Sequence, residues 1–215
     1  MTYLEIVNSV LRRLREDQVE TVAETSYSVL IGDFVNDAKT VVEDAHSWSA
    51  LRTSVEFDTV SGTAIYALTN AGQDAEVREA MNISNSSIMG MSNRSVMNKR
   101  YNLTTPAEGT PTEFSFNGTD ANGDITVRVY PKPNGIYSLF FDAFIKQATL
   151  SADASVLKVP YNPVVQLAFG MALRERGETG GQTAVEQYAL AEAALSDAIA
   201  FDANKYEEDT VYHAV

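Results

Sequence analysis

Apolar residues recur at helical spacing over the first fifty residues. A stripe along residues 3–15 predicts a helix whose last turn is rich in arginine, and it is formed by Leu4, Val7, Leu11 and Leu14. A second helical pattern covers residues 26–47, with apolar side chains on one face and Asp33, Asp37, Lys39 and Asp44 expected on the other. The pattern therefore predicts two amphipathic helices at the start of the chain.

The period then changes from helical to two. Val55 and Phe57 alternate with acidic residues, and a second alternating run over residues 64–68 follows the Ser61-Gly62 turn, which predicts a hairpin. Residues 77–83 predict a further strand. Residues 84–102 are rich in Ser, Asn and Met, and we expect only one or two helical turns there, around residues 96–101.

A second β region has clearer boundaries. Residues 113–116 and 125–130 flank a run of turn-forming residues, which predicts another hairpin. After a Pro-Gly turn at residues 131–135, alternate positions of residues 137–145 share one apolar face. This pattern predicts three consecutive antiparallel strands.

Helical patterning returns near the end of the chain. Residues 164–176 are apolar nearly all round, so this helix needs partners on every side, and Gly177 ends it. A last helix through about Ala200 carries small residues that would let another helix approach closely: Ala189, Ala193, Ala194 and Ala198. Residues 202–215 form an acidic tail.

The order of helices, strands and helices predicts the α+β class. We expect a helical bundle built from the N- and C-terminal helices, with an antiparallel β region inserted between them. The predicted domains are residues 1–50 with 160–201 for the bundle, residues 51–159 for the inserted region, and residues 202–215 for an extended acidic tail.

The charge of the chain restricts its partners. Its 215 residues carry 16 Lys and Arg against 29 Asp and Glu, a net charge of −13. Because each DNA phosphate contact needs a cation, such a chain is a poor DNA-binding protein, whereas a like-charged wall repels phosphates that slide past it. The start of the chain lacks the pattern of a secretory signal, and no window is apolar enough for a membrane span, which predicts a protein made in a cytoplasm.

Catalytic, cofactor-binding and metal-ligating residues are not predicted. Cysteine is absent, His46 and His213 lie far apart in the sequence, and no familiar catalytic motif occurs. An acidic pair brought together by the fold, as in a small hydrolase, stays open as an alternative. The methionines at 81, 89, 91 and 97 are typical of core filling or of an adaptable contact surface, and Trp48 of a core anchor or an interface residue.

The order of several short segments resembles phage head-to-tail connector (adaptor) proteins, most closely the tail tubular protein A type of short-tailed phages. The resemblance covers about three quarters of the chain, because the opening helices and the passage through Trp48 into the first strand also match. It rests on the order of segments rather than on one diagnostic residue: Gly109–Phe114, Ile125–Pro133, Leu150–Asp153 and Val159-Pro160.

The resemblance implies a non-enzymatic virion protein without cofactors, assembled in the host cytoplasm. Such adaptors form a homo-oligomeric ring, usually of twelve copies, between the portal protein and the tail nozzle protein. The ring extends the conduit through which double-stranded DNA passes during genome retention and ejection, without specific binding and without a membrane. An acidic lumen and an apolar helix at 164–176 fit this role.

Two groups of residues are candidate partner contacts. We expect Tyr206, Tyr212 and His213 of the tail on the portal side, and the turns around Asn122 and Asn134 on the tail-nozzle side. The main alternative function is another phage neck, tail-completion or stopper protein, which shares a helix-plus-β organisation.

Overall fold

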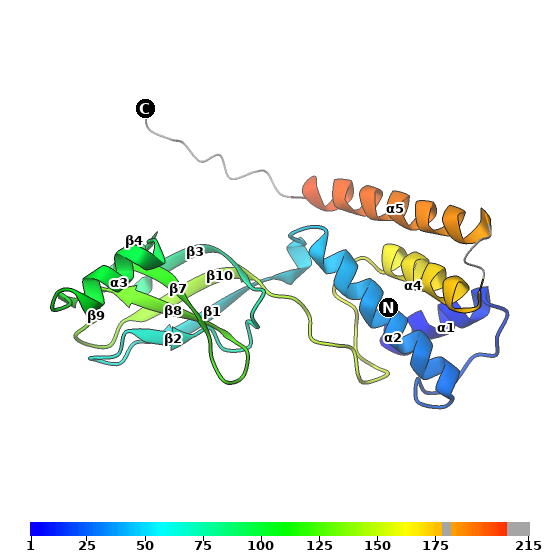
Figure 1. Ribbon diagram of the computed structural model, residues 1–215, viewed down its shortest axis with the longest axis horizontal. Helices are drawn as coiled ribbons and strands as arrows, with labels where there is room; N and C mark the ends of the chain where they lie inside the picture. The colour runs from blue at the N-terminus through cyan, green and yellow to red at the C-terminus, as the bar shows by residue number, and fades with distance from the viewer. Residues whose placement is uncertain (178–181, 206–215) are drawn as a thin grey trace. The chain divides into compact units, whose positions relative to one another are not determined.

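The structure is a computed structural model that describes residues 1–177 and 182–205; of residues 182–184 only the backbone is described. The described chain divides into two compact units, a helical unit of residues 1–50 with 147–205 and a β unit of residues 51–146. Figure 1 shows the elements of each unit.

Four α-helices build the helical unit: α1 (Tyr3–Arg13), α2 (Ser26–Asp44), α4 (Tyr161–Glu175) and α5 (Gln182–Ala203). Threonine hydroxyls cap the first two, because Thr2 and Thr25 each accept a hydrogen bond from a backbone N–H of the first turn. Three residues of the stripe predicted for α1 are buried, Val7, Leu11 and Leu14. The prediction that Lys39 lies on the outer face of α2 is wrong, because this side chain is buried. A short 3₁₀ helix, η1 (Ser49–Leu51), follows α2.

The apolar helix α4 finds its partners within its own chain. It packs against α1, α2 and α5, and Ala168 and Ala172 are fully buried. Gly170 faces α5, and a Cβ at this position would lie 3.4 Å from the Tyr188 ring, which is an ordinary van der Waals contact. The predicted need for partners all round is therefore met inside the helical unit, and α4 provides no argument for a ring.

Two four-stranded sheets pack face to face in the β unit. One has the order β1-β10-β3-β4 and the other β2-β8-β7-β5, and a two-stranded sheet pairs β6 with β9. The strands are β1 (Arg52–Asp58), β2 (Ile65–Ala67), β3 (Glu76–Asn82), β4 (Ser87–Ile88), β5 (Gly90–Met91), β6 (Glu108–Gly109), β7 (Glu113–Thr119), β8 (Ile125–Tyr130), β9 (Lys132–Pro133) and β10 (Ser138–Phe144).

Aromatic residues join the two sheets. Phe141 of β10 meets Phe114 of β7 edge to face, with ring centroids 5.3 Å apart, and stacks with Phe57 of β1 at 5.7 Å. Val127 and Val129 of β8 and Leu139 of β10 are fully buried in the same cluster. A short 3₁₀ helix, η2 (Ile83–Asn85), and one α-helix, α3 (Arg94–Asn102), complete the unit.

Two predictions about the strands are wrong. The strand at residues 52–58 does not form a hairpin with the next one, because β1 pairs with β10 and β2 pairs with β8 in the other sheet. Likewise β10 does not continue the β7–β8 hairpin but lies between β1 and β3. The Ser61-Gly62 turn and the turn after Pro133 therefore carry the chain from one sheet to the other.

The predicted architecture, a helical bundle with an inserted antiparallel β region, is also wrong. The described chain is α+β with five α-helices, one of them in the β unit, and its sheets are not all antiparallel, because β5 pairs with β7 and β6 with β9 in parallel. Residues 51–146 lie between the two segments of the helical unit in the sequence, but they bury an aromatic core of their own and are a structural unit in their own right.

Candidate interaction surfaces

The helix α3 lies on the β unit through one face. Met97 is fully buried, and the Tyr101 hydroxyl donates a hydrogen bond of 2.6 Å to the carbonyl of Val129 in β8. Burial raises the pKa of Tyr101 to about 12. Arg100 forms an ion pair of 2.8 Å with Glu113 of β7 and lies over the Tyr130 ring. These contacts anchor α3 and leave its opposite face exposed.

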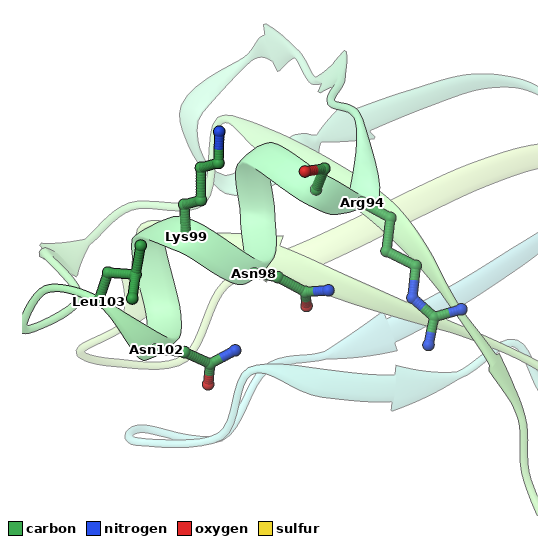
Figure 2. Close-up of a pocket in the computed structure, with 6 residues that line it drawn as sticks. Arg94, Asn98, Lys99, Asn102 and Leu103 are labelled. Carbon is green, nitrogen blue, oxygen red and sulfur yellow. The ribbon is translucent and has the colours of Figure 1, made fainter.

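The exposed face of α3 and its C-cap combine cations and amides with apolar area. It borders a shallow depression of about 500 Å³ lined by Arg94, Ser95, Asn98, Lys99, Asn102 and Leu103, and these six residues are called the α3 surface (Figure 2). Leu103 is 76% exposed. Within the described residues Arg94 and Lys99 have no ion-pair partner, and the α3 surface contains no carboxylate.

A second depression continues from Arg94 onto the neighbouring strands. Its lining includes Met91 of β5 and Phe116 of β7, and it too lacks an acidic residue. The methionines of this region divide between the two predicted roles, because Met89 and Met97 are buried whereas Met91 is largely exposed. Residues 80–107 hold three cations and no acid, although the whole chain has 29 acids.

The helix α5 presents a mostly exposed face on the helical unit. An exposed row at spacings of four, three, four and four residues, called the α5 row, consists of Glu186, Leu190, Ala193, Asp197 and Phe201. Leu190 is 59% exposed and Phe201 is 71% exposed, and Lys205 Nζ lies 5.3 Å from the Phe201 ring centroid. Ala191, which was not among the alanines predicted to receive a helix, is the buried one.

The C-terminal end of α5 is held by one buried carboxylate. Asp202 accepts hydrogen bonds from the Ser49 backbone N–H at 2.9 Å and the Ser49 hydroxyl at 2.7 Å, and it pairs with Lys205 at 3.2 Å. Burial raises the pKa of Asp202, but the hydrogen bonds from Ser49 and Lys205 outweigh it and hold the pKa below its usual value. The start of the predicted extended tail is thus helical and tied to η1.

The two candidate nozzle-side turns lie at opposite ends of β8, because one precedes this strand and the other follows it. Asn122 is exposed in the β7–β8 turn, where its backbone N–H donates to the Asp120 carboxylate at 2.8 Å. Asn134 is exposed before β10 and accepts a hydrogen bond of 2.7 Å from the Tyr137 hydroxyl. The structure therefore does not bring them into one site.

The three candidate portal-side residues, Tyr206, Tyr212 and His213, lie outside the described residues. Trp48 is a core residue, 1% exposed, and its ring nitrogen donates a hydrogen bond of 2.6 Å to the carbonyl of Val42. His46 lies on the helical unit with Nε2 3.5 Å from Asp202.

The surroundings of Glu113, the carboxylate beside α3, do not suit a general acid. The hydrogen bond from Ser92 lowers the pKa of Glu113, with a further contribution from Arg100, although burial opposes them. A general acid such as a hydrolase needs has a raised pKa instead. Among the described residues no group of three potential metal ligands occurs, and no described helix is long and apolar enough to cross a membrane.

Comparison with known proteins identifies the family. A profile of the SU10 adaptor protein family matches residues 1–212, so the chain belongs to this family. No curated protein shows a significant match. Family membership supports a structural, non-enzymatic role as a phage head-tail adaptor in the virion, in contact with other phage head or tail proteins. It confirms the resemblance to phage adaptors, while the tail tubular protein A type stays a prediction.

Proposed function

We propose that the chain is a virion adaptor that forms a ring between the portal and the tail nozzle and extends the DNA conduit for genome retention and ejection. The family match over residues 1–212 carries this proposal. The described surfaces support it, because they combine exposed apolar side chains with charge, as protein interfaces do.

The net charge of −13 suits a conduit wall. A lumen lined by carboxylates repels the DNA phosphates, so the DNA passes without binding. We propose twelve copies per ring, the number that the resemblance to connector proteins implies.

The two ends of the adaptor are assigned to different parts of the chain. We propose that the segment with Tyr206, Tyr212 and His213 contacts the portal, and that the exposed turns with Asn122 and Asn134 contact the nozzle. Because those turns lie at opposite ends of β8, they would meet different parts of the nozzle ring.

Light scattering during size-exclusion chromatography tests the portal contact. The purified chain is run alone and after mixing with the portal of the same phage, and we expect co-elution at one chain per portal chain. A chain that elutes as a compact monomer even when mixed with the portal would contradict the proposal. Binding to the nozzle alone would instead favour a tail-completion or stopper protein.

A truncation after Lys205 tests the portal-side assignment. It keeps the Asp202 contacts with Ser49 and Lys205, so the helical unit should stay folded. We expect weaker co-elution with the portal and an unchanged far-UV circular dichroism spectrum per residue for the remaining chain. Undiminished portal binding would contradict the role of Tyr206, Tyr212 and His213.

A further inference from the structure

The two units carry very different charges. The β unit has 8 basic and 10 acidic side chains, whereas the rest of the chain has 8 basic and 19 acidic ones. Most of the net negative charge of the chain, −11 of −13, therefore lies outside the β unit. Within the β unit, the α3 surface adds a local excess of positive charge.

The α5 row and the α3 surface have complementary chemistry. Residues 182–203 contain four acids and no cation, whereas residues 94–102 contain three cations and no acid. Both surfaces add exposed apolar side chains, Leu190 and Phe201 in the α5 row and Leu103 at the end of α3. Apolar side chains next to charges of opposite sign are what a specific protein contact needs from both partners.

We propose that the α3 surface of one copy binds the α5 row of a second copy. This inference rests on the proposed ring and names its subunit contact. The contact is heterologous, because two different faces of the same chain meet, and a heterologous contact that closes on itself generates a ring. In it Arg94 and Lys99 of one copy face Glu186 and Asp197 of the next.

A protein partner fits the α3 surface better than DNA does. Only Arg94 and Lys99 are available there, since Arg100 is held by Glu113, and phosphate binding gains affinity from each added cation. Leu103 and Met91 add apolar area that a phosphate backbone would leave in water. The α5 row carries carboxylates that can pair with these cations and apolar side chains that can cover this apolar area.

Cross-linking between two populations of the full chain tests the contact. Because the chain contains no cysteine, each introduced thiol is unique. One population carries Ser95→Cys on α3, the other carries Ala193→Cys on α5 and a different tag, and a short bis-maleimide joins them with and without the portal. Both positions are exposed. We expect a cross-linked dimer that carries both tags. The control pairs Ser95→Cys with Ser151→Cys, an exposed position of the helical unit outside the α5 row, and should give a lower yield of this dimer.

Charge reversal sharpens the test. In the Ser95→Cys population, R94E/K99E should lower the cross-linked yield about tenfold or more, because like charges then face each other. Adding E186K/D197K to the Ala193→Cys population should restore the yield. The control variant K158E/R174E reverses two exposed cations outside both surfaces and should leave the yield unchanged. Circular dichroism checks that each variant is folded.

Three results would overturn the inference: a yield for Ser95→Cys with Ala193→Cys no higher than the control pair, a yield insensitive to R94E/K99E, or duplex DNA that binds the wild type and is released by R94E/K99E. The portal experiment is separate. If the chain binds the portal but does not form this cross-link, the subunit contact is contradicted and the proposed function is not. If the chain does not bind the portal, the proposed function is contradicted.

Discussion

The helical unit and the β unit are held together in different ways. The β unit surrounds an aromatic core in which Phe141 meets rings from β1 and β7, and its charges nearly balance. The helical unit is strongly acidic and places an ion pair, Lys39 with Glu43, in its interior, with both side chains at most 4% exposed. Both units satisfy buried polar groups, since Asp124 of the β unit accepts the backbone N–H groups of Asn70 and Gly72, but this buried ion pair belongs to the helical unit.

The buried pair has a defined structural task. Lys39 Nζ bonds Glu43 at 3.0 Å and the carbonyl of Gln147 at 2.6 Å, while Glu43 accepts the Gln147 N–H at 3.2 Å. Gln147 is where the chain re-enters the helical unit. The acidic unit thus uses one of its few cations to hold the returning segment in place.

The largest expected effect is in the β unit. Phe141→Ala removes a fully buried ring and should lower the free energy of unfolding by about 3–5 kcal/mol. Urea unfolding followed by circular dichroism measures the loss, and hydrogen exchange should accelerate most in residues 51–146. Equal acceleration in α1 and α2 would show that the two units do not differ in this way.

A smaller but localised effect is expected from the ion pair. Lys39→Met leaves the Glu43 carboxylate buried without its cation and should cost about 3 kcal/mol, whereas K39M/E43L replaces both charges and should recover most of the loss. The fluorescence of Trp48, the single tryptophan, reports unfolding of the helical unit. A double variant no more stable than Lys39→Met would show that charge burial is not the cause.

The smallest effect is a pH dependence at α5. The pKa of Asp202 is lower in the folded chain than in the unfolded one, so its ionised form stabilises the folded state. This stabilisation is fully present above the usual Asp pKa of about 3.9 and is lost as the pH falls through the pKa of Asp202 in the folded chain. Hydrogen exchange of residues 195–205 should therefore accelerate below about pH 4. Asp202→Asn should remove this step and leave exchange in the β unit unchanged.

Much of the local structure could be predicted from the chain. Apolar spacing located α1, α2, α4, α5 and the β7–β8 hairpin, because each of these elements depends on neighbours in the sequence. Strand partners could not be predicted the same way. Alternation shows which side chains of β1 share a face, but the same alternation is compatible with pairing to any other strand. In the structure β1 pairs with β10, which lies eighty or more residues away in the sequence.

The candidate surfaces show the same limit. The cations and amides of residues 94–102 were visible as a polar, acid-free stretch, yet the ion pair of Arg100 with Glu113 decides which cations stay available. The small residues of α5 were expected to receive a helix. The contacts of Tyr188 with Gly170 and of Gln187 with Gln166 show which side of α5 meets α4, and Ala189 and Ala193 are exposed.

The amino-acid sequence by itself determined the acidic charge, the positions of the main helices and the resemblance to phage adaptors, because these follow from composition, periodicity and segment order. The tertiary structure alone decided that β1 and β2 join different sheets, that α4 is covered by its own chain, and that exposed apolar side chains gather on α3 and α5. Each of these depends on contacts between residues far apart in the chain, and such contacts leave no periodic signal in either partner.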